Sequence, residues 1–316
     1  MKFHYLNILI FLFPFLCCSP AQHKDGCPIQ DSTDWKEHNL YGKVKTIEYY
    51  NVRLENASFK DIEDPSIEKK IVFNEYGKLV SMEDFHSLGE IIYKTSNYYD
   101  TNQRMIETLF VDFMDNSKYK QMYQYDNNDN LVLTRDYSCD SLVQITYIEQ
   151  NGKKFVKSII ISEKSDTTIK YLHEEEQLLG NGELLKIKKS WIGENNEDIY
   201  SQTLKYDKND NLIQNISISD FLGEIKTILE YDKKNCLKKS IFYANNIIDY
   251  ETSFDDLKNP ILIKNYKNGK LISTIKNQYS YDKCNNWIKK EVRIKGVGSN
   301  KFIPAFIETR IIEYYE

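Results

Sequence analysis

The chain has 316 residues, 41% of them hydrophobic and 28% charged, and its formal net charge is −5. This composition is typical of a folded globular protein, and the slight acidic excess provides no basic stripe of the kind that nucleic-acid binding requires. The chain contains 24 Tyr and 15 Phe but only four Ala. Because aromatic side chains favour strands and Ala favours helices, the composition predicts an all-β protein.

Residues 1–21 have the pattern of a signal peptide. Lys2 precedes an apolar run from Tyr5 to Phe15. This run is too short to span a bilayer and has the length of the hydrophobic region of a secretory signal. We therefore expect the protein to be exported.

Cys18 is the predicted lipid-attachment site. It follows Phe15, Leu16 and Cys17 in an arrangement similar to a bacterial lipobox, although the usual Leu and the usual Gly, Ala or Ser are replaced. The expected location is the cell envelope, as an outer membrane lipoprotein facing the periplasm or the surface, with the lipid as the only membrane anchor. The alternative is secretion after cleavage at Ala21.

Residues 22–40 form a polar leader in which STDWKEHNL predicts a short helix, with Ser32, Thr33 or Asp34 as its cap. If Cys17 and Cys18 belong to the signal, four cysteines remain, and exported proteins can form disulfides. Four cysteines allow three pairings, between which the sequence does not choose. Their wide spacing without C-x-x-C argues against a zinc site; they are Cys27, Cys139, Cys236 and Cys284.

Residues 41–316 contain a repeat of about 25 residues. Each unit begins with an aromatic anchor, followed by Asp or Asn, a polar turn and an apolar residue. Consecutive anchors are 26, 26, 81, 25, 23 and 27 residues apart, so two degenerate units are expected in the long gap, near 147–156 and 178–185. The anchors, to which we assign a structural role, are Phe73, Tyr99, Tyr125, Tyr206, Tyr231, Phe254 and Tyr281.

The residues between anchors alternate between apolar and polar, which indicates strands with one buried face. Asn151-Gly152, Asn181-Gly182 and Asn268-Gly269 predict tight hairpin turns, because both residue types tolerate positive φ. Each unit is therefore expected to contain two strands and two turns. The predicted fold is one continuous antiparallel meander of β-hairpins, curved or partly rolled, whose neighbouring units bury one another's apolar faces.

The heptads YDNNDNL and YDKNDNL also match the beginning of a calcium-binding loop, D-x-N-x-N. An EF-hand then requires Gly at position six and Glu at position twelve, where the first heptad leads to Leu131 and Tyr137. Asp and Asn are equally common in turns, because their side chains hydrogen-bond their own backbone. We therefore predict turns and expect neither a metal site nor a cofactor.

The anchors resemble the YD repeats of the Rhs family, and Gly77 occupies the glycine position of that pattern. NLYGKVKTIEYY at 39–50 and the closing units at 281–294 and 307–316 are similar to the small YD-repeat lipoproteins of Bacteroidetes-like bacteria. In the large Rhs proteins that this chain resembles, the repeats form a shell around a cargo. Roughly ten hairpins are expected to be too few to close such a shell, and the self-cleaving D-P-x-G segment is missing.

The sequence contains no recognised catalytic motif, so we do not expect an enzyme. The first functional hypothesis is an interaction module for a protein partner. The alternative is a carbohydrate-binding protein, for which Trp191 and Trp287 are the candidate ligand-binding residues. The recurring anchor tyrosines are predicted to form a cross-strand aromatic ladder rather than a sugar-binding groove.

Overall fold

The computed structural model describes residues 34–53, 66–151, 153–161, 167–178, 184–192, 198–219 and 223–316. Side chains are described in these ranges except at Arg53, 149–178 and 187–199. The signal peptide, Cys18, Ala21 and Cys27 lie outside the described residues, as do Gly152 and the Asn181-Gly182 pair.

The described chain contains one short helix and twenty strands. No described helix has the length and apolarity needed to cross a membrane. In chain order the elements are α1 (Asp34–Glu37), β1 (Val44–Arg53), β2 (Ser66–Phe73), β3 (Leu79–Phe85), β4 (Ile91–Tyr99), β5 (Met105–Asp112), β6 (Ser117–Tyr125), β7 (Leu131–Ser138), β8 (Ser141–Asn151), β9 (Lys153–Ile161), β10 (Thr167–Leu178), β11 (Leu184–Ile192), β12 (Asp198–Tyr206), β13 (Leu212–Ser219), β14 (Gly223–Tyr231), β15 (Leu237–Ala244), β16 (Ile247–Phe254), β17 (Pro260–Lys267), β18 (Lys270–Tyr281), β19 (Trp287–Gly296) and β20 (Ile303–Tyr314).

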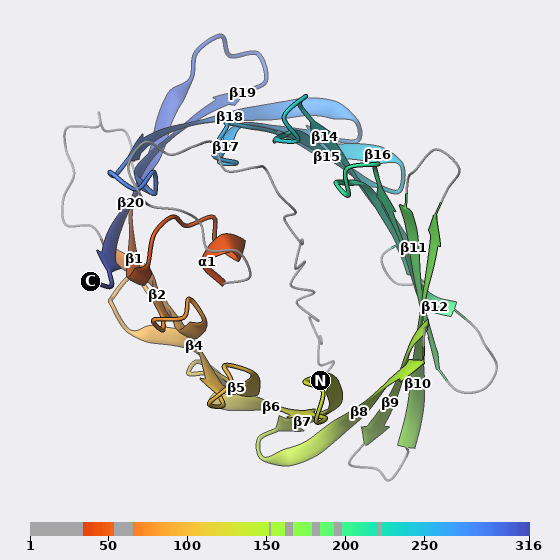
Figure 1. Ribbon diagram of the computed structural model, residues 1–316. Coiled ribbons are helices and arrows are strands. Elements are labelled where there is room, and N and C mark those ends of the chain that lie inside the picture. Colours follow the sequence, from red (N-terminus) through yellow and green to blue (C-terminus); the bar gives the residue numbers. More distant parts are fainter. Residues whose placement is uncertain are drawn as a thin grey trace.

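The strands form a single antiparallel meander, which confirms the predicted fold class. Each strand pairs with the next, and β20 also pairs with β1 over nine residue pairs, from Val44–Tyr314 to Arg53–Phe306. The sheet therefore returns to its first strand, and Figure 1 shows the resulting ring. The sequence left open whether the sheet closes; the pairing of β1 with β20 joins its two ends edge to edge.

The heptads are turns, as predicted. In each of seven repeats an Asp or Asn follows the strand, and its Oδ1 accepts hydrogen bonds from the backbone N–H groups two and four residues later. This arrangement satisfies the turn's backbone with the side chain of its own first residue. The residues are Asn74, Asp100, Asp126, Asp207, Asp232, Asp255 and Asp282.

The fourth residue of each turn has a positive φ, which explains why the glycine of the repeat pattern can be replaced. Asn and Asp visit this region at modest cost, whereas Gln103 and Lys258 are held there by the surrounding turn at φ of 61° and 62°. The other positions are Gly77, Asp129, Asp210, Asn235 and Asn285.

At the opposite end of the strands, tight turns connect the hairpins. Asn268-Gly269 has φ values of 51° and 73°, as expected for a type I′ turn, and confirms the hairpin predicted there. Two hairpins also fill the long gap in the repeat, because Asn151 pairs with Lys153 and Leu178 pairs with Leu184. The degenerate units are therefore present at the predicted places.

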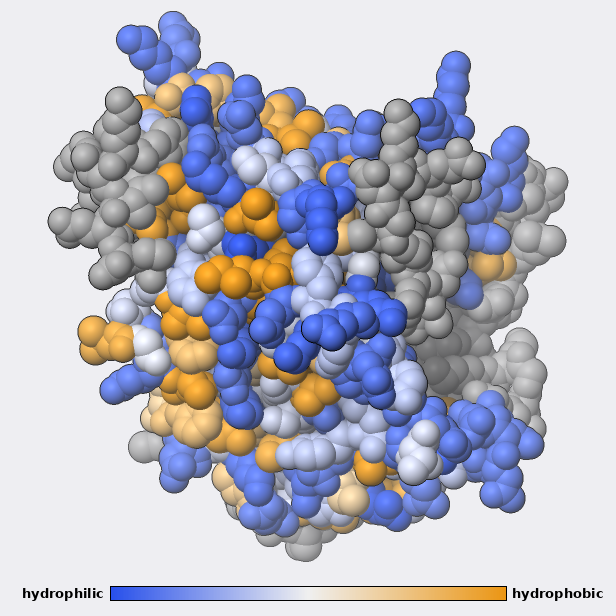
Figure 2. Space-filling view, turned by 60° about the vertical axis from the view of Figure 1, so that its left-hand side comes forward, coloured by the Kyte–Doolittle hydropathy of each residue, from blue (hydrophilic) through white to orange (hydrophobic). Residues whose placement is uncertain are grey.

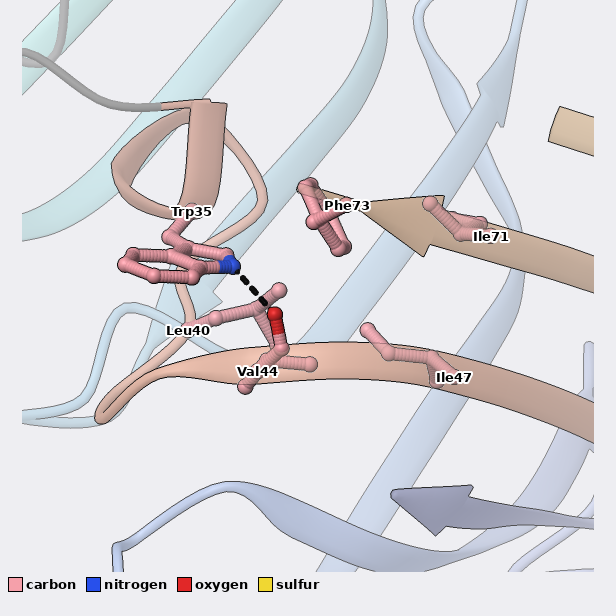
Figure 3. Close-up of a cluster of buried hydrophobic side chains, with 6 residues drawn as sticks. All are labelled: Trp35, Leu40, Val44, Ile47, Ile71 and Phe73. Carbon is pink, nitrogen blue, oxygen red and sulfur yellow. Dashed lines mark hydrogen bonds between the residues drawn. The ribbon is translucent and has the colours of Figure 1, made fainter. Parts of the chain in front are cut away.

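The largest buried cluster lies where α1 packs against the first two strands. The predicted helix in the leader is present, and its Trp35 is fully buried, with Nε1 donating a 2.7 Å hydrogen bond to the carbonyl of Val44 (Figure 3). The cluster comprises Trp35, Leu40, Val44, Ile47, Ile71 and Phe73. We call the face of the sheet that carries Ile47 and Ile71 the inner face, because α1 lies within the ring (Figure 1).

The segment after α1 also contacts the far end of the chain. The Tyr41 N–H donates to Oδ1 of Asn286 at 2.8 Å, and Nδ2 of Asn286 donates to the Tyr41 carbonyl at 2.7 Å. Asn286 is 1% exposed, so this reciprocal pair is shielded from water. It stabilises the closed ring near the pairing of β1 with β20.

Candidate functional site

Over part of the ring, the two faces of the sheet differ in charge. Directly paired residues of antiparallel strands point to the same side of the sheet. Starting from Ile47, the residue pairs therefore identify the inner-face residues of every strand around the ring. Across β13 to β17 six charged residues lie on the outer face, while paired inner positions hold neutral side chains such as Asn215, Thr227 and Thr252. The six are Glu224, Lys226, Glu230, Lys239, Glu251 and Lys264.

Ion pairs connect neighbouring strands on the outer face. Lys70 lies 2.8 Å from Glu48, Lys94 lies 2.7 Å from Glu83, and similar contacts recur elsewhere. Exposed apolar residues such as Ile311 lie between the charges, and Figure 2 shows blue and orange residues interspersed over one side of the molecule. Pairs of this kind contribute little each. The inner face carries ion pairs as well, between Lys69 and Asp84 and between Lys290 and Glu308.

Three aromatic side chains form a row on the inner face of β4, β5 and β6. The ring centroids of Tyr93 and Phe110 are 5.9 Å apart, and those of Phe110 and Tyr119 are 6.2 Å apart. Tyr119 is 45% exposed although it points into the ring. We call these three residues the aromatic row; the register links it to the buried cluster through the pairs Ile71–Met82, Met82–Thr95, Thr95–Phe110 and Phe110–Tyr119.

Polar groups surround the aromatic row. Asp112 pairs with Tyr93, and its Oδ1 accepts hydrogen bonds from the backbone N–H groups of Met114 and Asp115 at 2.9 and 3.2 Å. Asp136 pairs with Gln121. Burial raises the pKa of Asp136, and a hydrogen bond from the Gln121 side chain opposes that shift.

The aromatic row has more acidic than basic neighbours on its own face. Asp84 of β3 pairs with Tyr93 and forms a 3.1 Å ion pair with Lys69 of β2 on the same face. Asp112 and Asp136 are the charged residues on the inner face of β4 to β7, whereas the basic residues of these strands point outward. The outward residues are Lys94, Lys118, Lys120 and Arg135. The inner face here is therefore aromatic, polar and slightly acidic.

A second aromatic pair lies farther around the ring. Phe242 and Tyr250 stack with centroids 4.7 Å apart and an interplanar angle of 7°. Tyr250 is 38% exposed. Nearby, Nδ2 of Asn265 donates to Oγ of Ser273 at 2.9 Å. Side chains on the inner face therefore remain accessible to solvent at two places.

Trp287, one of the two tryptophans singled out from the sequence, is not part of these accessible places. Trp287 is 8% exposed, and the Arg310 guanidinium carbon lies 3.3 Å from its ring centroid. The same carbon lies 4.6 Å from the ring of Tyr49. Burial lowers the pKa of Arg310 to about 10. Trp191 lies in β11 opposite Tyr171, and its side chain is outside the described residues.

The anchors end the strands that precede the turns, and their tyrosines connect adjacent units by hydrogen bonds. The hydroxyl of Tyr99 donates to the carbonyl of Leu79 at 2.8 Å, that of Tyr125 to Met105 at 2.9 Å, and that of Tyr231 to Leu212 at 3.0 Å. In place of the predicted cross-strand ladder of aromatic side chains, these anchor tyrosines thus form mainly hydrogen bonds from a hydroxyl to a carbonyl. Tyr281 differs, since its hydroxyl donates to Oδ2 of Asp255 at 2.7 Å.

Within the described residues no group of three or more His, Cys, Asp and Glu side chains could hold a metal ion. The Asp oxygens of the heptads instead accept hydrogen bonds from the turn itself, as in Asn211 Nδ2 to Asp207 Oδ2 at 3.0 Å. Cys284 is disulfide-bonded, whereas Cys139 and Cys236 are in no disulfide. The structure therefore contains none of the three complete pairings of Cys27, Cys139, Cys236 and Cys284.

Sequence reasoning missed the aromatic row. Tyr93 and Tyr119 occupy the same position in their repeats, six residues before the anchors Tyr99 and Tyr125, but Phe110 lies on the intervening strand, so the repeat pattern alone does not group all three. The available signal was the period-two alternation within each strand, but the strand register is needed to bring Tyr93, Phe110 and Tyr119 together.

No family model matches the sequence, and no curated protein matches it. Distant structural similarity extends to a porin-like protein from Bacteroides uniformis ATCC 8492, with a TM-score of 0.33 and 6% identity, covering 85% of this chain and 98% of that one. It also extends to TcdB2-TccC3-TEV and TcdB2-TccC3-Cdc42, each with a TM-score of 0.21, at 11% and 10% identity. In both cases 83% of this chain is covered but only 19% of the other, so the chain spans about a fifth of their length.

Proposed function

We propose that the protein is a non-enzymatic, exported binding protein of the cell envelope that holds its partner on the inner face of the ring. The observation that carries this proposal is the exposure of inner-face aromatic side chains, 45% for Tyr119 and 38% for Tyr250. Buried polar and aromatic groups normally pack or pair. Large aromatic side chains that stay exposed to solvent inside a closed sheet are suited to receive another molecule.

Closure of the ring restricts how a partner can bind. An open meander would offer edge strands to an extended segment of another chain. Here β1 and β20 pair with each other, so the two ends of the meander provide no such edge. The partner, whether protein or glycan, therefore contacts side chains of a sheet face rather than the backbone of an edge strand.

The turns support an assignment to YD-repeat proteins, closest to the small lipoproteins of this kind. In all seven, the same side-chain oxygen accepts from the same two backbone positions. With the apolar run at the beginning of the chain, this assignment includes lipid attachment at Cys18 and a location in the outer membrane. Labelling with a radioactive fatty acid is expected to tag the wild type and not Cys18→Ala; an untagged wild type would favour secretion after Ala21.

The second candidate is carbohydrate binding, and the aromatic row favours it. Sugar rings present apolar C–H faces that pack on aromatic rings, and their hydroxyl groups pair with side chains such as those of Gln121 and Asp136. A protein partner requires no such combination of groups.

Site-specific photocrosslinking in native cell envelopes tests the binding surface. A benzophenone side chain is placed at Tyr119 on the inner face, and at Tyr98 on the outer face of β4 as the matched control, since Tyr98 is 48% exposed. We expect adducts with a protein or glycan from position 119 and none from position 98. Adducts from position 98 alone would contradict the assignment to the inner face.

A further inference from the structure

We infer that the aromatic row, Tyr93, Phe110 and Tyr119, is a binding site for uncharged glycan chains that discriminates against acidic ones. The inference deepens the second candidate function above and rests on the inner face being the binding surface. It assigns specific residues and a ligand class to one part of that face.

The geometry of the row suits a chain of sugars. Consecutive centroids at 5.9 and 6.2 Å place one ring on each of three neighbouring strands, so the row runs across the sheet rather than along a strand. Phe110 has no polar group to contribute, whereas Tyr93 and Tyr119 each add a hydroxyl to an aromatic face. Contact with successive sugar units in this direction distributes the binding energy over several rings.

Hydrogen-bonding groups lie beside the rings in the register. Asp112 pairs with Tyr93, Thr95 pairs with Phe110, and Ser138 pairs with Tyr119. Together they supply hydroxyl and carboxylate groups next to all three rings. Sites of this kind combine apolar contact with a few polar groups that fix the orientation of the ligand.

The charge pattern determines which glycans can bind. Asp112 and Asp136 lie on the inner face of β4 to β7, and the basic residues of those strands point outward. A uronic acid carboxylate would therefore meet two like charges there, while the inner-face Lys69 of β2 is already paired with Asp84 of β3 at 3.1 Å. Neutral sugars do not meet this repulsion. The site should therefore retain neutral polysaccharides and reject polyuronates.

A peptide fits the site less well. Peptides that bind to sheets gain most of their affinity from backbone hydrogen bonds along an edge strand. The strands β4, β5 and β6 are each paired on both sides. A peptide on this face would leave its own backbone groups without partners from the sheet.

The test measures retention of the purified mature protein on immobilised β-1,4-glucan, α-1,4-glucan, mannan and polygalacturonate. We expect retention on at least one of the three neutral polymers and none on polygalacturonate. Tyr119→Ala should weaken that retention at least about tenfold, and the matched outer-face variant Tyr98→Ala should leave it unchanged. Circular dichroism confirms that both variants keep the fold.

Asp136→Asn tests the charge argument independently. It keeps an amide that can pair with Gln121, and it should raise retention on polygalacturonate while leaving retention on the neutral polymer within about twofold. Absence of retention of the wild type on all three neutral polymers would overturn the inference, as would equal losses in Tyr98→Ala and Tyr119→Ala. If inner-face crosslinking captured a protein in the same cells, the proposed function would stand while the glycan assignment fell.

Discussion

At the scale of single residues, the repeat is stabilised by one carboxylate or amide per turn. Hydrogen bonds from the side chain and the backbone of Asn130 are the main reason that the pKa of Asp126 lies below its usual value. At Asp207 burial acts in the opposite direction, yet the bonds from Asn211 and Asn209 outweigh it and lower the pKa. These local bonds are why the turns were predictable from a seven-residue pattern.

Asp207→Ala should destabilise the protein by about 1–2 kcal/mol, because the N–H groups of Asn209 and Asn211 lose their acceptor at 2.8 and 3.0 Å. Asp210→Asn in the same turn is the control: residue 210 has a φ of 60°, which Asn tolerates, and it should change stability by less than about 0.5 kcal/mol. Urea unfolding monitored by circular dichroism measures both. Equal losses would contradict the role of the Asp207 side chain.

The turn carboxylates also predict an acid-dependent stability. The folded-state pKa values of Asp100, Asp126, Asp207 and Asp232 are lowered, so each contributes stability that is present above the unfolded pKa of about 3.9 and is lost as pH falls through the folded value. The unfolding midpoint in urea should therefore drop as the pH is lowered below about 4. In Asp207→Asn the urea midpoint should fall less steeply with pH than in the wild type. An unchanged pH dependence would contradict the contribution of the Asp207 carboxylate.

At the scale of elements, the strands and turns followed from the sequence because their determinants are local. Alternation defined the strands, and Asn268-Gly269 defined a hairpin. The register that brings the aromatic row together depends on bulges at the anchors, such as the shift between Tyr98 and Tyr99. A shift of one residue exchanges the two faces, and no local pattern revealed these shifts.

The helix α1 contributes to stability through packing rather than through its length. It has four residues, too few to be stable alone, so its fully buried Trp35 must provide most of the contact. Trp35→Ala should cost about 3–5 kcal/mol, whereas Glu37→Ala, at an exposed position of the same helix, should cost less than about 0.5 kcal/mol. Thermal and urea unfolding would measure both, and a small effect of Trp35→Ala would show that the ring does not depend on the helix.

At the scale of the whole molecule, closure of the sheet was the main feature that sequence could not supply. It depends on residues at opposite ends of the chain, including Tyr41 with Asn286 and the pairing of β1 with β20. Repeat number alone did not indicate it, since strand tilt and stagger also determine whether a sheet closes. Closure is also what separates an inner from an outer face, and therefore what creates the candidate site.

Ile312→Pro tests closure directly. Ile312 pairs with Ile47, the third of the nine residue pairs between β1 and β20. Proline there removes an N–H and does not fit a central strand. If that contact closes the ring, the variant should expose the edges of β1 and β20 and self-associate as its concentration rises. Light scattering after size-exclusion chromatography measures this, with Glu316→Pro, beyond the end of β20, as the control. A monomeric Ile312→Pro with unchanged hydrogen exchange in β1 would mean that the remaining strands hold the ring without this contact.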